Sequence, residues 1–252
     1  MDSGVRLAVE EQDGRGSIAR ITIDNQNRLN ILNASLISQL TSIAKGLRDD
    51  ERIRAVVVTG AGDRSFVGGA DVKEMVDLKP ESARAYITDL HHACAAIRRL
   101  NVPVIARISG HCLGAGLEVA ASCDLRIAAE HSVFGMPEVR VGIPSVIEAA
   151  LLPNLIGWGR TRQLVLTGET ISAGEALSWG LLERVVPASG LDDGVRGWTG
   201  SILSAGPVAI RLQKALTRQW ERLPIDQAIE RGIESFVEAY KTDEPRVMMT
   251  KF

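Results

Sequence analysis

The chain has 252 residues, 45% of them hydrophobic, which is enough to bury a substantial core as one large domain or as one domain with a smaller appendage. Its 29 basic and 31 acidic residues give a net charge of -2, and neither sign forms a long run that would indicate a nucleic-acid or membrane partner. The N-terminal segment lacks a basic stretch followed by an apolar one, and no window approaches the roughly 18 apolar residues of a membrane span. These features predict a soluble, cytoplasmic protein.

The cysteines and histidines do not form a metal-binding pattern. The three cysteines make neither an even set nor a CxxC pair, so we expect buried, reduced thiols. The four histidines lack the spacing from cysteines or carboxylates that metal ligands show, and we therefore expect no metal site. These residues are Cys94, Cys112, Cys123, His91, His92, His111 and His131.

The first 60 residues predict a hairpin, a helix and a strand. Residues 5–11 and 18–25 alternate apolar and polar side chains around a glycine-rich segment, which is typical of a β-hairpin. Apolar residues then recur at helical spacing from Ile31 to Leu47 and predict an amphipathic helix. Residues 55–60 follow as a short apolar strand.

A strand that enters a glycine-rich turn and then a helix occurs twice. The first turn spans residues 61–71 and precedes a helix start and a longer helix, and the second spans residues 110–116 after an apolar strand. Residues 124–130 read as a further strand, and residues 132–142 as another that is interrupted at Pro137.

From about residue 145 the pattern is helical, apart from an extended piece at 181–186. This order predicts an α/β core of repeated strand-strand-helix units and a C-terminal helical part that packs on the core or on a neighbouring chain. We place the core at residues 1–195 and the helical region at 196–252.

The two glycine turns are candidate anion sites. A glycine turn at a helix start presents unpaired backbone N–H groups, and glycine lets a ligand approach them closely. Two such turns can each aim one N–H at the same oxygen and so stabilise an oxyanion or enolate. The alternative is that the glycines only allow tight packing. A dinucleotide site is disfavoured because Glu118 stands where the third glycine of that fingerprint belongs.

Two glutamates interrupt apolar runs. Glu118 lies in the first helical turn after the second glycine turn, and Glu138 follows Pro137. Either glutamate alone is explained by a helix cap or a salt bridge. Together they suggest a pair of carboxylates with environment-shifted acidity, suited to moving protons to and from a water or a substrate carbon.

Three segments, residues 65–75, 110–144 and 164–187, resemble in order and spacing the signature segments of the crotonase superfamily, the enoyl-CoA hydratases and isomerases. The resemblance runs from about residue 5 to residue 220. It implies a spiral of four strand-strand-helix turns followed by a helical trimerisation region, and assembly into a homo-trimer or a hexamer made of two trimers.

The resemblance also implies the chemistry. An acyl-CoA thioester would place its carbonyl oxygen between the backbone N–H groups of Ala70 and Ala115. Glu118 and Glu138 match two catalytic glutamates that activate water for addition to a trans-2-enoyl-CoA, which gives a 3-hydroxyacyl-CoA. Glu118 would be the base and Glu138 the proton donor. No cofactor is implied, because coenzyme A is part of the substrate.

Contacts with the CoA part follow from the same resemblance. Arg28 and Leu29 should lie near the nucleotide, and Lys73 near the phosphates, although a solvated lysine explains Lys73 equally well. The other residues implied in substrate contacts are Gly68, Gly69, Asp71, Val72, Gly114, Pro137 and Ser145.

The chain departs from the family pattern after Glu138. Residues 142–153 replace a glycine-rich loop and put Ser145 where a glycine N–H would help to hold the water. Ser145 and Glu148 have the spacing of a capping box, which predicts that Glu148 faces outward; the alternative is a third carboxylate at the site. The C-terminal residues that often reach CoA in the family are not carried over to Lys251 or Phe252. The altered loop leaves two further functions open, a double-bond isomerase and a non-catalytic acyl-CoA-binding or scaffold protein.

Overall fold

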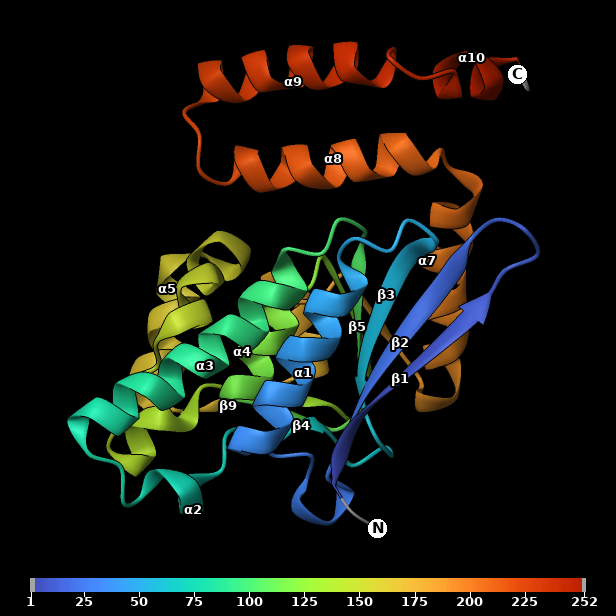
Figure 1. The fold of residues 1–252 in the computed structure, drawn as a ribbon. Coiled ribbons are helices and arrows are strands. Elements are labelled where there is room, and N and C mark those ends of the chain that lie inside the picture. Colours follow the sequence, from blue (N-terminus) through green and yellow to red (C-terminus); the bar gives the residue numbers. More distant parts are fainter. Residues whose placement is uncertain (1–2, 251–252) are drawn as a thin grey trace.

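The computed structural model describes residues 3–250 and contains two sheets joined by a spiral of the chain (Figure 1). Within these residues the larger sheet has the strand order β1-β2-β3-β5-β7-β10 and the smaller one the order β4-β6-β8-β9. The strands of the larger sheet are Gly4–Glu11, Ser17–Asp24, Ile53–Gly60, Val104–Ile108, Leu125–Ala129 and Arg184–Val186. Those of the smaller sheet are Ser65–Val67, His111–Leu113, Val133–Gly135 and Thr170–Ser172.

The predicted opening elements are confirmed. β1 and β2 pair antiparallel as a hairpin, and β2 then pairs in parallel with β3, whose eight residues are all buried. Helix α1 (Ala34–Leu47) begins after Asn33, whose side chain accepts a hydrogen bond from the Leu36 N–H. Such an N-cap satisfies one of the free N–H groups at a helix start.

Each turn of the spiral sends one long strand to the larger sheet and the next, short strand to the smaller sheet. β3 and β4 are followed by α2 (Val72–Met75) and α3 (Pro80–Arg98), and β5 and β6 by α4 (Ala115–Ala121). β7 and β8 lead to the 3-10 turns η2 (Pro137–Val141) and η3 (Ile147–Leu151) and to α5 (Leu152–Thr167). The fourth turn has the order β9, α6 (Ala173–Trp179), β10. The predicted α/β class with strand-strand-helix units is confirmed.

The strand predicted over residues 132–142 is wrong beyond residue 135. β8 ends at Gly135, and Pro137 opens η2, so Glu138 lies in a 3-10 turn and not in a strand. Proline has no N–H to donate to a sheet, which explains why the strand ends before it.

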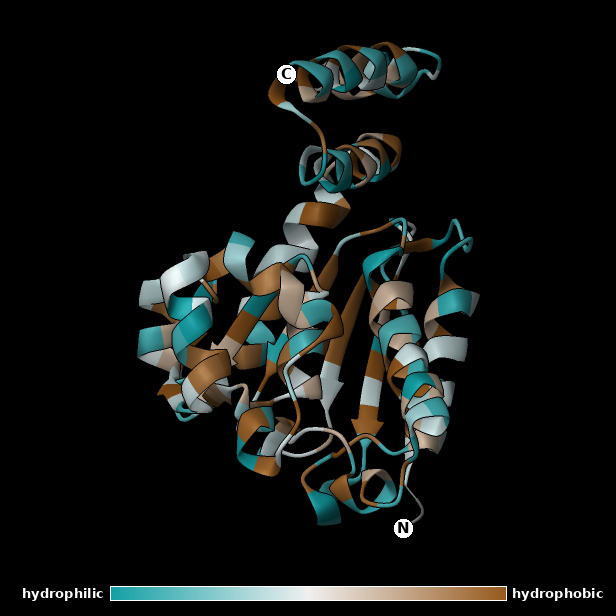
Figure 2. Ribbon diagram, turned by 90° about the vertical axis from the view of Figure 1, so that its left-hand side faces the viewer, coloured by the Kyte–Doolittle hydropathy of each residue, from teal (hydrophilic) through white to brown (hydrophobic). Residues whose placement is uncertain are grey.

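The core lies on both faces of the larger sheet. One face packs against α1, α3 and α4, and the other is covered by α7 (Leu191–Ser204), which buries Leu191, Val195, Ile202 and Leu203. Figure 2 shows the hydrophobic strands in the middle of the molecule, between helices of mixed hydropathy. The predicted boundary between residues 195 and 196 falls inside α7, and the division into two regions stays a prediction.

The last helices stand away from the sheets (Figure 1). α8 (Pro207–Trp220) and α9 (Ile225–Ala239) run side by side and α10 (Glu244–Met249) follows them. Large apolar side chains of α9, among them Ile229, Ile233 and Phe236, are exposed. Lys251 and Phe252 lie outside the described residues. No helix within residues 3–250 combines the length and apolar character needed to cross a membrane.

Candidate active site

The two glycine turns meet. β4 and β6 pair in parallel, with Ser65 opposite His111 and Val67 opposite Cys112, so the turns that follow them emerge side by side. A Cβ atom built on Gly114 would lie 4.0 Å from the Gly69 Cα. Both glycines have a positive φ, 124° for Gly69 and 52° for Gly114, which side chains disfavour.

Each turn presents a free backbone donor. Ala115 is the first residue of α4, so its N–H has no partner within the helix. Ala70 forms an isolated parallel bridge with Leu32, in which the Asp71 N–H donates to the Leu32 carbonyl and the Gly69 carbonyl accepts from the Leu32 N–H. Neither the Ala70 nor the Ala115 N–H donates a hydrogen bond to any acceptor in residues 3–250. The two adjacent glycine turns therefore each carry one backbone N–H group that is available to a ligand, at Ala70 and at Ala115.

Glu118 is buried on α4, with 4% of its surface exposed. Its Oε1 accepts a hydrogen bond from the Ala149 N–H at 3.2 Å. Burial raises the pKa of this carboxyl to about 8, against the effect of the Ala149 hydrogen bond, and the charges of Glu138 and Glu148 add to the rise. Glu118 therefore exchanges its proton near neutral pH, as a group used in proton transfer should.

Glu138 lies against the second glycine turn. Its Oε1 lies 2.7 Å from the position of a Cβ on Gly114, so the missing side chain at this glycine makes room for the carboxylate. Its Oε2 accepts a hydrogen bond from the Ser145 hydroxyl at 2.7 Å. The structure thus places Gly114, Glu118, Glu138 and Ser145 near one another, and their roles in a reaction stay a prediction.

The prediction that Glu148 faces outward is wrong. Glu148 is 7% exposed, and its Oε1 lies 2.8 Å from the Nδ1 of His91 on α3. Ser145 does not cap η3: the residue before this turn is Val146, and the Ser145 hydroxyl donates to Glu138 instead. A histidine on the neighbouring helix supplies the partner that lets the carboxylate enter the core.

His91 is a residue that sequence reasoning missed. It lies 57 positions before Glu148, on the helix that also carries the buried Leu90 and Cys94. A histidine beside buried positions of an amphipathic helix is a weak signal, and nothing in the local sequence of α3 indicates its partner.

The segments predicted to contact CoA are joined to each other. The Arg28 guanidinium pairs with both carboxylate oxygens of the buried Asp71, at 2.6 and 2.8 Å, and holds the pKa of Asp71 below its usual range. The Gly68 N–H donates to the Leu29 carbonyl at 2.9 Å. Val72 and Lys73 are exposed on α2, next to this junction. Pro137 opens the turn that carries Glu138.

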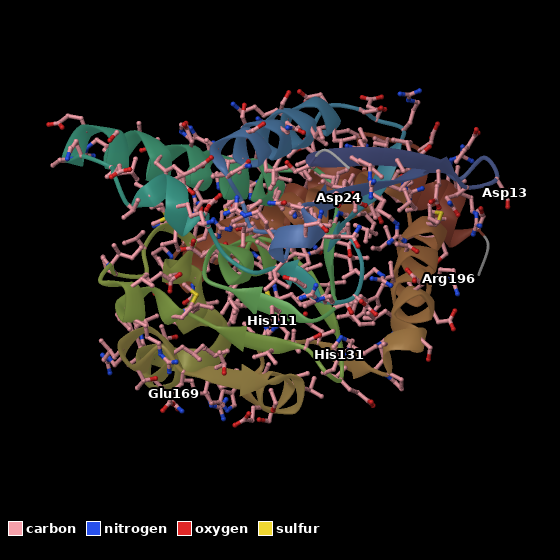
Figure 3. All side chains as sticks on the ribbon, turned by 90° about the horizontal axis from the view of Figure 1, so that it is seen from below. Asp13, Asp24, His111, His131, Glu169 and Arg196 are labelled. Atoms are coloured by element: carbon pink, nitrogen blue, oxygen red, sulfur yellow. The ribbon has the colours of Figure 1, made fainter. Side chains whose placement is uncertain are left out.

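The remaining histidines and the cysteines make no hydrogen bond to Glu118, Glu138 or Glu148 within residues 3–250. Figure 3 views the molecule from below and labels His111 and His131, and the His131 ring contacts the Asp63 carbonyl oxygen at 3.2 Å. The prediction of buried free thiols is confirmed for Cys94, Cys112 and Cys123. Within residues 3–250 no group of three or more histidine, cysteine, aspartate or glutamate side chains is arranged to hold a metal ion.

The chain is similar to characterised proteins along nearly its whole length. The family described as "Enoyl-CoA hydratase/isomerase" matches residues 13–252. The chain is 35% identical to the "Short-chain-enoyl-CoA hydratase" of Clostridium acetobutylicum, over 94% of this chain and 91% of the relative. It is 36% identical to the "(E)-benzylidenesuccinyl-CoA hydratase" of Thauera aromatica, over 86% and 83%.

Solved structures give the same result. The structure of an enoyl-CoA hydratase from Bacillus anthracis superimposes with a TM-score of 0.88 at 31% identity and covers 94% of this chain and 91% of that one. The family model matches residues 13–252, and both the relative and the solved structure align over 94% of this chain, so the chain is an enzyme of the enoyl-CoA hydratase/isomerase family, within the crotonase superfamily.

Proposed function

We propose that this enzyme adds water to a short-chain trans-2-enoyl-CoA and forms the 3-hydroxyacyl-CoA. The observation that carries the proposal is the meeting of two carboxylates, Glu118 and Glu138, at the junction of the two glycine turns. Relatives described as "Short-chain-enoyl-CoA hydratase" and "Crotonyl-CoA hydratase" support this substrate class.

In the proposed mechanism the thioester carbonyl oxygen accepts hydrogen bonds from the Ala70 and Ala115 N–H groups. As water adds to the β-carbon, negative charge moves onto this oxygen, and fixed donors stabilise it by several kcal/mol of the barrier. The donors are backbone groups on packed turns, so they need no reorganisation during the reaction.

The two glutamates divide the proton transfers. Glu118 takes a proton from the water while the oxygen bonds to the β-carbon, and Glu138 gives a proton to the α-carbon. The carboxyls together accept one proton and release one, and the substrate gains the elements of water. Dehydration uses the same groups in swapped roles. With a pKa raised to about 8, the Glu118 carboxylate is a stronger base than an ordinary glutamate. It acts as base only when deprotonated, so the rate of hydration should rise with pH up to about 8.

The CoA part would lie along the junction of residues 28–32 and 68–73. The ion pair between Arg28 and Asp71 fixes this junction, and the exposed Lys73 is available to phosphates. Coenzyme A belongs to the substrate, and the proposed reaction needs no further cofactor.

We also propose that the chain forms a homo-trimer or a pair of trimers through its C-terminal helices. α8 and α9 enclose an open apolar groove that includes Trp220, Leu223, Ile229, Ile233 and Phe236. A water-exposed apolar surface of this kind is typical of an interface.

The direct test is incubation with crotonyl-CoA while the absorbance of the conjugated enoyl thioester is followed. We expect the absorbance to fall and 3-hydroxybutyryl-CoA to form. Glu118→Gln and Glu138→Gln should each slow turnover by about 10²-fold or more, since each removes a proton-transfer group. Glu130→Gln changes an exposed glutamate and serves as the matched control.

Two results would contradict the proposal. Enoyl-CoA thioesters of four to eight carbons that all stay unchanged would exclude hydration. Conversion of a 3-enoyl-CoA to the 2-enoyl isomer without water addition would assign the site to double-bond isomerisation instead.

A further inference from the structure

The buried Glu148 has no role in the two-glutamate mechanism. One of its oxygens contacts His91, and the other, Oε2, is buried without a hydrogen-bond partner in residues 3–250. Removing a carboxylate from water costs several kcal/mol even when it is paired. A group kept at this cost next to a reactive site needs an explanation.

Glu148 lies within the segment that holds both catalytic carboxylates. The Ser145 hydroxyl, near the start of this segment, donates to Glu138, and the Ala149 N–H, at its end, donates to Glu118. Residues 145–149 therefore fix one oxygen of each glutamate. A shift of this short segment would move both hydrogen bonds.

The backbone conformation of residues 145–149 is not one that their own φ preferences favour. Ile147 has φ = 40°, in the left-handed region, which is a genuine outlier for a β-branched residue and costs about 1 to 3 kcal/mol. Such a conformation persists only where the surroundings impose it. The side-chain contact of the next residue, Glu148, with His91 ties the segment to the long helix α3.

We propose that His91 and Glu148 form a positioning pair for Glu118. The pair holds the segment 145–149 in place, and Glu148 adds its negative charge to that of Glu138 beside the Glu118 carboxyl. The inference rests on the proposed function, because it assigns Glu118 the role of base. His91 and Glu148 act through Glu118 and are positioning residues.

The charged groups around His91 and Glu148 determine in which direction the pKa of Glu118 changes when Glu148 is replaced. Glu118 faces Glu138 from η2 and Glu148 from η3, and both raise its pKa. Glu148 in turn faces His91 and Arg98, both on α3, and these oppose the rise in its own pKa that burial causes. The Cys94 thiol on α3 also faces Glu118 and Glu148, and its pKa is raised so far that it stays neutral. Loss of the Glu148 charge therefore lowers the pKa of Glu118.

The test compares four variants in the crotonyl-CoA assay across pH. Glu148→Gln keeps the shape and an oxygen that can accept from His91 but removes the charge. His91→Gln removes the imidazole, and the two are also combined. His92→Gln, at the exposed neighbour of His91, is the matched control.

We expect Glu148→Gln to move the acidic limb of the pH profile of kcat/KM to lower pH, because the charge that it removes raises the pKa of Glu118. His91→Gln should lower kcat by about tenfold with little change in KM, as expected for a misplaced catalytic group. Because the residues act as a pair, the double variant should be no slower than the slower single one. His92→Gln should match the unmodified chain.

An acidic limb that stays in place in Glu148→Gln, or effects of the single variants that add in the double one, would overturn the inference. A merely structural role would lower the melting temperature without moving the limb. If the unmodified chain has no hydratase activity, the proposed function fails by itself. A ¹³C NMR titration of the Glu118 carboxyl, assigned with Glu118→Gln, then still decides whether the Glu148 charge acts on Glu118.

Discussion

Replacement of Glu118 by glutamine should stabilise the folded protein at alkaline pH while it slows turnover by about 10²-fold or more. In the folded chain the pKa of this carboxyl is about 8, mainly because of burial, against an ordinary value of 4.5. Between these values the folded state keeps the proton that the unfolded chain releases. The contribution of Glu118 to stability is therefore fully present below pH 4.5 and is lost as the pH rises through 8.

The magnitude follows from the two pKa values. The difference between about 8 and 4.5 corresponds to about 5 kcal/mol at high pH, and the part that falls between pH 5 and pH 8 is about 3 kcal/mol. The glutamine side chain of the variant stays neutral throughout, and its oxygen can still accept the Ala149 N–H. The free energy of unfolding of Glu118→Gln should thus exceed that of the unmodified chain by about 3 kcal/mol more at pH 8 than at pH 5.

The assay is urea unfolding at several pH values, at one fixed protomer concentration because association changes apparent stability. Crotonyl-CoA turnover is measured on the same samples. Glu130→Gln, at an exposed site, should leave the pH dependence of unfolding unchanged. The reasoning is refuted if the stability difference between Glu118→Gln and the unmodified chain is the same at pH 5 and pH 8.

Three further substitutions test the site. Gly114→Ala places a Cβ 2.7 Å from the Glu138 Oε1, at a position where the backbone φ is 52°. The Glu138 carboxylate must then shift, so kcat should fall by about 10²-fold. A near-normal kcat would show that the position of this carboxylate is not critical. Ile147→Gly relieves the φ of 40° and should raise the free energy of unfolding by about 1 kcal/mol at pH 7. A lower melting temperature for this variant would contradict backbone strain at this position. Arg28→Ala leaves the buried Asp71 carboxylate without its ion-pair partner, so stability should fall and KM should rise. An unchanged KM would separate the Arg28 and Asp71 junction from CoA binding.

The long elements could be predicted from the sequence, and the short ones could not. The hairpin, α1 and β3 have enough residues for a period of two or of 3.6 to be counted. β4, β6 and β9 have three residues each, and β4 and β6 lie within segments that glycines mark as turns. Their strand character comes from pairing with each other and with β8, and this depends on the whole spiral.

The sequence indicated those candidate site residues that lie close together along the chain. Gly114 and Glu118 lie in the same turn and helix, and Glu138 stands out as a carboxylate after a proline. The pairing of His91 with Glu148 was not predictable, because it joins α3 to η3 across 57 residues. The local spacing of Ser145 and Glu148 predicted a helix cap instead. In the structure the long-range contact of Glu148 with His91 forms in place of that cap.

The conformation of residues 145–149 is evidence that the site is used for catalysis and not only for binding. It holds a β-branched residue in the left-handed region at Ile147 and a buried carboxylate at Glu148, and each of these lowers stability. Departures from local preference that gather in a few residues are expected where function requires a particular geometry. Here the geometry obtained is a fixed oxygen on each of Glu118 and Glu138. A scaffold that only holds acyl-CoA through backbone donors would gain nothing from fixing these two carboxylates, whereas an enzyme that moves a proton with each of them would.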